Sequence, residues 1–244
     1  MSETIKRENL LGIGFITLAM AAFAVEDSLI KLLSTRLASG QILLMIGLGG
    51  TLGFFIWSRQ KGEGVTAEMM RNPWVIGRTL SELVGTAFFV LSLALVPITT
   101  VSAIIQVSPL LVTLGAAVML REKVGIRRWS AILVGLLGVA VILRPWSATF
   151  EASALLALMG VIGLSARDVA TRRIAKSTPS LALATLGFGA TIPAGLILLI
   201  FDPRLIVPTP TDSLLIVVSI LIAIGFICCI ILCGLYSIEW RILS

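Results

Sequence analysis

The amino-acid sequence predicts an all-α integral membrane protein with about eight transmembrane helices, arranged as an inverted repeat of five-helix units whose second copy is incomplete. Three observations carry this prediction: the apolar composition, the length of the apolar runs and the one-sided distribution of positive charge. Hydrophobic residues make up 57% of the 244 residues and charged residues 13%, with a mean hydropathy of +1.06. Average soluble domains contain about 25% charged residues, so this chain has too few charges to cover a soluble surface.

Apolar runs bounded by charges or turn residues predict the membrane spans. A helix that crosses the hydrocarbon core needs about 20 mostly apolar residues, and these runs have that length. Helices are favoured over barrel strands because a spanning helix satisfies its backbone hydrogen bonds within itself. The runs cover residues 10–33, 41–58, 74–96, 99–120, 128–146, 152–171, 180–201 and 213–236.

The distribution of lysine and arginine predicts the orientation in the membrane. With the N-terminus in the cytoplasm, the expected outer loops contain only Arg36, Arg144 and Arg204, and the first run contains Lys31. The rest of the 19 lysines and arginines fall on the inner side, as the positive-inside rule requires. We therefore expect a multi-pass membrane protein with a cytoplasmic N-terminus. One alternative stays open, because residues 6–24 also resemble a cleavable signal peptide.

Two matches between the halves of the chain predict an internal repeat. Asp27 and Lys31 match Asp168 and Arg172 at an offset of 141 residues. The glycine-rich stretches at 47–51 and 187–191 match at an offset of 140 residues. The repeat unit contains an odd number of spans, so its second copy enters the membrane from the opposite side, as in the inverted repeats of secondary transporters.

The two predicted repeats differ in length. Residues 10–144 contain five spans, whereas residues 152–244 contain three. The repeat offset places the counterpart of Pro97 near residue 237, and the sequence ends at Ser244. We therefore expect the last two helices of the complete fold to be missing, through a premature stop, a frameshift or a shortened expressed chain.

Charged residues inside the predicted spans are candidates for substrate binding or coupling, because charge within a bilayer is costly. They fall in pairs four residues apart, which lets each pair neutralise itself on one helix face. The alternative is that such pairs only fix helix packing. Asp27 is also a candidate proton carrier, although a Lys31 partner would keep it charged. The charged candidates are Asp27, Lys31, Arg78, Glu82 and Asp168.

Gln106 completes the candidate set. It lies with Ser108 next to Pro109 in the fourth run, where a proline is expected to kink the helix and free a carbonyl one turn earlier. We expect the same of Pro193 in the seventh run. Such helices can line a substrate cavity or serve packing alone. Several glycines are expected to permit close helix approach: Gly49, Gly53, Gly135 and Gly138.

Several classes of site are not expected. The chain contains no histidine, which excludes histidine relays and histidine-bound metals. Its three cysteines, Cys228, Cys229 and Cys233, share one apolar run without metal-ligand spacing. The sequence has no basic run with interleaved aromatic residues, the pattern that would indicate nucleic-acid binding. We therefore expect no metal, no cofactor and no nucleic-acid partner.

A set of residues, most of them between 78 and 145, matches the pattern of a known transporter family: Lys31, Arg78, Ala94-Leu95-Val96-Pro97, Ala103-Ile104, Ser108-Pro109-Leu110, Ala116, Leu120, Glu122, Gly135, Gly138-Val139 and Pro145. With these residues, the chain resembles the EamA-like branch of the drug/metabolite transporter superfamily, and the resemblance extends more weakly over nearly the whole chain. The resemblance implies a ten-helix bundle of two inverted five-helix repeats that moves metabolites such as amino acids, nucleosides, vitamins or drugs, often outward. This chain departs from it by having eight predicted spans.

Together with this resemblance, the sequence predicts a secondary transporter of the bacterial inner membrane, an exporter or exchanger of a small metabolite, and not an enzyme. Its expected partners are a small-molecule substrate and the lipid bilayer, with a homodimer as one way to complete the bundle. Two alternatives stay open: an inactive remnant or non-transporting assembly protein, and a lipid-modifying membrane enzyme. The enzyme is disfavoured by the absence of histidine and of closely clustered carboxylates in the sequence.

Overall fold

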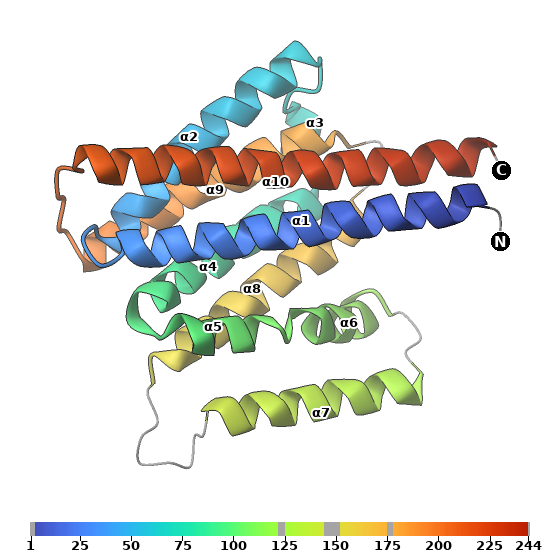
Figure 1. Cartoon of the computed structure of the whole chain (residues 1–244), viewed down its shortest axis with the longest axis horizontal. Coiled ribbons are helices and arrows are strands. Elements are labelled where there is room, and N and C mark those ends of the chain that lie inside the picture. Colours follow the sequence, from blue (N-terminus) through green and yellow to red (C-terminus); the bar gives the residue numbers. More distant parts are fainter. Residues whose placement is uncertain (1–2, 122–124, 144–151, 175–177, 244) are drawn as a thin grey trace.

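The computed structural model describes residues 3–121, 125–143, 152–174 and 178–243, and the regular structure in these ranges is helical. Successive long helices run in alternate directions, and both chain termini lie at the same end of the molecule (Figure 1). We call the end where α1 begins the N-terminal end, and the other the opposite end. The helices are α1 (Glu3–Leu33), α2 (Ser39–Gln60), α3 (Ala67–Arg71), α4 (Pro73–Leu95), α5 (Ile98–Ile105), α6 (Ser108–Met119), α7 (Ile126–Leu143), α8 (Ala154–Arg173), α9 (Ser180–Phe201) and α10 (Pro210–Leu243).

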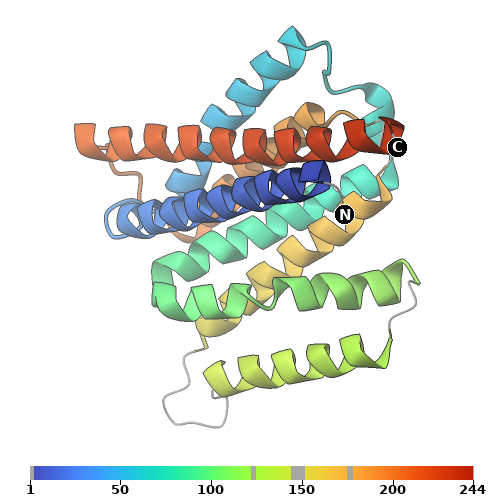
Figure 2. The same ribbon diagram turned by 45° about the vertical axis from the view of Figure 1, so that its right-hand side comes forward.

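Three helix pairs make most of the contacts in the bundle. They are α2 with α9, α4 with α8, and α1 with α10. The α1–α10 pair lies side by side on one face, and α7 lies at the edge of the molecule in both views (Figures 1 and 2). α4 also packs on α9, and α6 packs on α8. α4, α8 and α9 therefore pack together, and the α5–α7 segment joins them through α8.

Glycine allows the backbones of two of these pairs to touch. A Cβ atom on Gly163 of α8 would lie 2.6 Å from Cα of Gly85 in α4, and one on Gly195 of α9 would lie 2.7 Å from the carbonyl oxygen of Gly40 in α2. Real Cβ contacts are longer than this, so no larger residue fits at either crossing. These two crossings fix how α8 and α9 lie against the first half of the chain.

The glycines singled out from the sequence divide into two groups. Gly49 and Gly53 of α2 face the side chains of Ile220 and Ile224 in α10, and Gly135 of α7 faces Leu110 of α6. The expectation of close helix approach is confirmed at these three positions. It is wrong for Gly138, because a Cβ atom there would have no neighbour within 4 Å among the residues that the structure describes.

Five helical stretches of the described chain are long and apolar enough to cross a membrane, and two shorter ones are apolar. This agrees with a multi-pass membrane protein. The number of eight spans stays a prediction, because the runs 10–33, 128–146 and 213–236 extend beyond the residues or side chains that the structure describes. The five stretches are Ser39–Gln60, Pro73–Leu95, Ile98–Met119, Ala154–Arg173 and Ser180–Phe201, and the shorter ones are Trp129–Val141 and Pro210–Gly225.

The fourth predicted span is interrupted at its centre. α5 ends at Ile105 and α6 begins at Ser108, and the N–H of Val107 donates to the carbonyl of Ile104 at 3.1 Å in a tighter turn. Pro109 lies in the first turn of α6, where its missing N–H removes no helical hydrogen bond. It therefore starts a helix instead of kinking one. Pro193 lies inside α9, which is assigned as one continuous helix.

Candidate functional site

Four charged side chains from α4 and α8 meet inside the bundle, and we call them the ion-pair cluster: Arg78, Glu82, Arg167 and Asp168. Oε1 of Glu82 accepts a hydrogen bond from Nη1 of Arg167 at 2.9 Å. Nη2 of Arg167 lies 2.8 Å from Oδ1 of Asp168, and Nη2 of Arg78 lies 3.6 Å from Oε2 of Glu82. Two cations and two anions balance, so the cluster is neutral as a whole.

The close crossing of α4 and α8 explains why these side chains meet. Glu82 precedes Gly85 by about one helical turn, and Arg167 follows Gly163 by one turn. Because the backbones touch at the Gly85–Gly163 crossing, charged side chains one turn away on facing surfaces come within hydrogen-bonding distance. At the same end of the two helices, the guanidinium of Arg173 lies 5.7 Å from the ring centroid of Trp74.

The cluster also reaches α9. Nη1 of Arg78 donates to the carbonyl oxygen of Leu183 at 3.3 Å. Gly187 of α9 borders the charged groups, since a Cβ atom there would lie at ordinary contact distance, 3.5 Å from the Arg78 guanidinium nitrogens and 3.6 Å from Oε2 of Glu82. The side chains of Arg78 and Glu82 are only 13% and 12% exposed. One cluster therefore connects three helices in a largely apolar surrounding.

The cluster lies a short way inside the N-terminal end of the bundle. Arg78 is five residues from the start of α4 at Pro73, and Asp168 is five residues before the end of α8 at Arg173. At 1.5 Å of rise per residue, this places it about 8 Å from the helix ends. Guanidinium and carboxylate groups here can bind opposite charges of a substrate, or exchange partners when one of them is neutralised.

Lys31 lies towards the opposite end of the bundle and contacts backbone groups. Its Nζ donates to the carbonyl of Val96 at 2.8 Å and to that of Ala94 at 3.4 Å. These carbonyls lie at the C-terminus of α4, where a cation is favoured by the helix dipole. Among the described residues, no ion pair joins Lys31 to Asp27, which lies half-buried on α1. The expected Asp27–Lys31 pair is therefore wrong.

The other two expected pairs have different outcomes. The Arg78–Glu82 pair is confirmed. Asp168 was expected to pair with Arg172 but instead pairs with the adjacent Arg167. The structure thus brings Arg78, Glu82 and Asp168 together and leaves the other candidates apart from them.

Gln106 lies apart from the cluster at the break between α5 and α6. Its side chain is exposed, and its Nε2 donates to the carbonyl of Ser102 within the same turn at 3.3 Å. Next to it in sequence, the hydroxyl of Ser108 lies 3.2 Å from that of Ser165 and links α6 to α8. The break therefore contacts α8 through Ser108 and not through Gln106.

Arg167 is the site residue that the sequence analysis missed. It was counted with the cytoplasmic positive charges, although it lies inside the apolar run 152–171. Asp168 was selected because it is a charged residue within a predicted span, and the same criterion would have selected Arg167. In the structure it contacts both carboxylates of the cluster.

The described residues contain no group of three or more histidine, cysteine, aspartate or glutamate side chains placed to hold a metal ion. The side chains of Cys228, Cys229 and Cys233 lie outside the part that the structure describes.

Sequence comparison finds relatives among curated transporters. The chain is 29% identical over 165 residues to a riboflavin transporter of Rhizobium johnstonii, covering 67% of this chain and 55% of the relative. It is 24% identical to a pseudopaline exporter of Pseudomonas aeruginosa, over 67% and 57% of the two chains. It is 24% identical to an S-adenosylmethionine uptake transporter of Rickettsia bellii, over 71% and 59%. No solved structure matches.

These matches cover only part of each relative, so the chain spans little more than half the length of the curated relatives it matches. Their names describe transporters and not enzymes. The match to the family itself is broader, because it extends over residues 10–144 and so over more than half of this chain. The chain belongs to the EamA-like transporter family.

Proposed function

We propose that this protein is a secondary transporter that moves a small metabolite across the bacterial inner membrane, as an exporter or an exchanger. The observation that carries the proposal is the neutral ion-pair cluster, which connects α4, α8 and α9 inside an apolar bundle. Charges within membrane spans are costly and mark substrate or coupling pathways. The named substrates of the relatives, riboflavin, pseudopaline and S-adenosylmethionine, favour a small organic molecule.

We further propose that the chain is built as an inverted repeat, with residues 10–144 as the first copy and residues 152–244 as the second. In this repeat α1 corresponds to α8, α2 to α9 and α4 to α10. Exchanging the corresponding helices converts the α4–α8 pair into the α10–α1 pair and maps the α2–α9 pair onto itself, so the packing has the symmetry expected of a repeat. These are the three principal pairs of the bundle. The matched stretches 47–51 and 187–191 also face each other, because a Cβ atom on Gly50 would meet the Phe188 ring.

The repeat relates the ion-pair cluster to a different set of residues at the opposite end. Arg167 and Asp168 of α8 correspond to Glu26 and Asp27 of α1. Arg78 and Glu82 of α4 correspond to small or apolar residues of α10, at 218–219 and 222–223. The N-terminal end is thus bridged by the four-residue ion-pair cluster, whereas the opposite end has two carboxylates on α1 and one ion pair of 3.5 Å between Arg36 and Asp212 of α10. This difference supports a cycle in which α4–α8 and α1–α10 open alternately, with Asp27 as a coupling residue.

The proposed orientation places the N-terminus in the cytoplasm. It is supported by the concentration of lysine and arginine in the loops and tails at the N-terminal end of the bundle. The ion-pair cluster then lies on the cytoplasmic side of the bilayer and Lys31 on the other side. A substrate that enters from the cytoplasm would meet the cluster first.

The test is transport by the purified chain in proteoliposomes. Riboflavin, S-adenosylmethionine and a panel of zwitterionic amino acid derivatives serve as probes, each with and without an imposed proton gradient. We expect saturable flux of at least one probe, and a loss of about tenfold or more per folded molecule in the Glu82→Gln variant, with the folded fraction measured by gel filtration. Arg204→Gln, which alters an exposed ion pair, is the matched control and should retain full flux. Rates equal to those of empty liposomes for all probes would contradict the proposal.

A further inference from the structure

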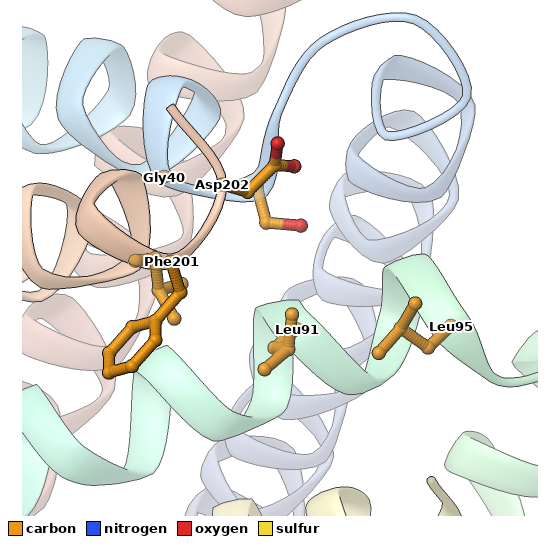
Figure 3. Close-up of a pocket in the computed structure, with 7 residues that line it drawn as sticks. Gly40, Leu91, Leu95, Phe201 and Asp202 are labelled. Carbon is orange, nitrogen blue, oxygen red and sulfur yellow. The ribbon is translucent and has the colours of Figure 1, made fainter. Parts of the chain in front are cut away.

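A groove opens on the bundle at the opposite end, where α2 begins and α4 and α9 end. It encloses a cavity of about 260 Å³. Figure 3 shows Leu91, Leu95 and Phe201 along it, with the carboxylate of Asp202 above them. The lining residues are Ser39, Gly40, Leu91, Leu95, Leu198, Phe201 and Asp202.

Three helices build the groove. The Gly40–Gly195 contact draws the start of α2 against the last turns of α9. α9 ends at Phe201, and Asp202 is its C-cap. Leu91 and Leu95, one turn apart on α4, form the other wall. The groove therefore exists because two helices end and one begins at the same level of the bundle.

The two parts of the groove differ in polarity. Its wall carries exposed apolar side chains, with Phe201 81% and Leu95 58% exposed. In a membrane, such side chains contact hydrocarbon without cost. Its rim carries the hydroxyl of Ser39 and the carboxylate of Asp202. An apolar wall that ends in a polar rim at the end of a span is suited to an amphipathic ligand.

Both signs of charge are available at the rim. The carboxylate of Asp202 accepts hydrogen bonds from Nε and Nη2 of Arg204 at 2.7 and 2.8 Å. These hydrogen bonds hold the pKa of Asp202 below its ordinary value, so the carboxylate stays ionised at neutral pH. The side chains of Asp202 and Arg204 are 39% and 72% exposed. A ligand can therefore reach an anion and a cation side by side.

We propose that this groove binds a phospholipid with a zwitterionic aminophosphate head group, of the phosphatidylethanolamine type. One acyl chain lies along Leu91, Leu95 and Phe201. The ammonium group of the lipid contacts Asp202, and its phosphate contacts Arg204. An anionic phospholipid such as phosphatidylglycerol satisfies only the arginine and places its phosphate near the carboxylate, so charge complementarity selects the zwitterion. The site is separate from the transported substrate and does not depend on the proposed function.

The test is native mass spectrometry of the purified full chain, with equimolar phosphatidylethanolamine and phosphatidylglycerol added in detergent. We expect the wild type to retain phosphatidylethanolamine severalfold over phosphatidylglycerol. Asp202→Asn should reduce this preference to near unity. Glu68→Gln, which removes an exposed carboxylate at the N-terminal end, is the matched control and should keep the preference.

A second variant tests the acyl-chain part of the groove. Leu91→Trp fills the wall and should reduce retention of both lipids, while circular dichroism and gel filtration stay unchanged. Soluble glycerophosphoethanolamine, which has the head group without chains, should not displace the bound lipid. Equal retention of the two lipids by the wild type, unchanged preference in Asp202→Asn, or displacement by the soluble head group would each overturn the proposal.

Discussion

Glu82 of α4 and Arg167 of α8, 85 residues apart in sequence, are joined by a contact of 2.9 Å between Oε1 and Nη1. Each has a second partner, because Glu82 also contacts Arg78 and Arg167 also contacts Asp168. The four charges therefore stabilise one another as a chain of alternating sign. Removing Glu82 leaves Arg78 without its partner, and removing Arg167 leaves an excess negative charge at Glu82; these two side chains are only 13% and 12% exposed.

We expect Glu82→Gln and Arg167→Gln each to destabilise the folded bundle strongly. Removing one partner of a buried ion pair typically costs about 3–5 kcal/mol, because the other charge stays buried without compensation. The double variant restores charge balance and should cost less than the sum of the two single changes. Denaturant unfolding in detergent micelles measures all three. Strictly additive effects would contradict a coupled cluster.

Arg204→Gln provides the comparison for an exposed ion pair. The Asp202–Arg204 pair has short contacts but lies largely in solvent, where such pairs contribute little to stability. We expect no measurable change in unfolding for this variant. The Glu82–Arg167 and Asp202–Arg204 pairs both have contacts shorter than 3 Å. A difference in stability between the variants at Arg167 and Arg204 therefore reports the effect of burial and not of distance.

Asp27→Asn should abolish flux or its pH dependence while leaving protein abundance near that of the wild type. Asp27 lies on α1 apart from any described ion pair, since Lys31 donates to the carbonyls of Ala94 and Val96. Neutralising Asp27 therefore leaves no buried cation without a partner. Quantitative immunoblotting of membranes and proteoliposome flux give the two readouts. A fall in abundance with normal flux per molecule would assign Asp27 a structural role.

Lys31→Met, in contrast, should lower abundance because it removes the donor for two backbone carbonyls. The double variant Asp27→Asn with Lys31→Met should be no more abundant than Lys31→Met alone. This outcome is the reverse of that expected for an Asp27–Lys31 pair, in which the second change would relieve the first. Recovery of abundance in the double variant would show that the two residues pair in the membrane.

The spacing of charged residues identified most of the ion-pair cluster but could not determine its partners. The Arg78–Glu82 pair follows from the helical period alone. The choice between Arg167 and Arg172 as the partner of Asp168 depends on which face of α8 meets α4. The contact between Gly85 and Gly163 sets that face, and no periodicity within one helix reveals a crossing between two.

The helix boundaries show the same division between local and tertiary signals. α3 depends on a local signal, because the hydroxyl of Thr66 accepts a hydrogen bond from the N–H of Met69 and caps the helix. The helix has only five residues, and the sequence analysis treated it as part of the loop at 59–73 between two predicted spans. The break between α5 and α6 precedes Pro109 and leaves Gln106 exposed. A proline within an apolar run indicates a helix start and a helix kink equally well, so tertiary packing decides between them.

Single-cysteine labelling should place the two ends of the bundle on opposite sides of the membrane. In a background with Cys228, Cys229 and Cys233 replaced by serine, Val65→Cys lies in the loop before α3 and Val207→Cys in the loop before α10. We expect an impermeant thiol reagent to label Val207→Cys in intact cells and Val65→Cys only after permeabilisation. Labelling of Val65→Cys in intact cells would refute the proposed cytoplasmic N-terminus.

Two glycine-to-alanine changes should have opposite effects on stability. In Gly163→Ala, the added methyl group would lie 2.6 Å from Cα of Gly85, and backbone cannot move aside as a side chain can. Overpacking of this kind typically costs about 1–3 kcal/mol, and by separating α4 from α8 it should also weaken the Glu82–Arg167 contact and lower flux.

Gly138→Ala is the control, because no atom of the described part of the chain lies within 4 Å of a Cβ atom placed there. Alanine is the better helix former by up to about 1 kcal/mol, so this variant should be neutral or slightly more stable. Unfolding in detergent and flux in proteoliposomes are measured on the same preparations. If Gly163→Ala were as stable and as active as Gly138→Ala, the α4–α8 crossing could not be what holds the ion-pair cluster together.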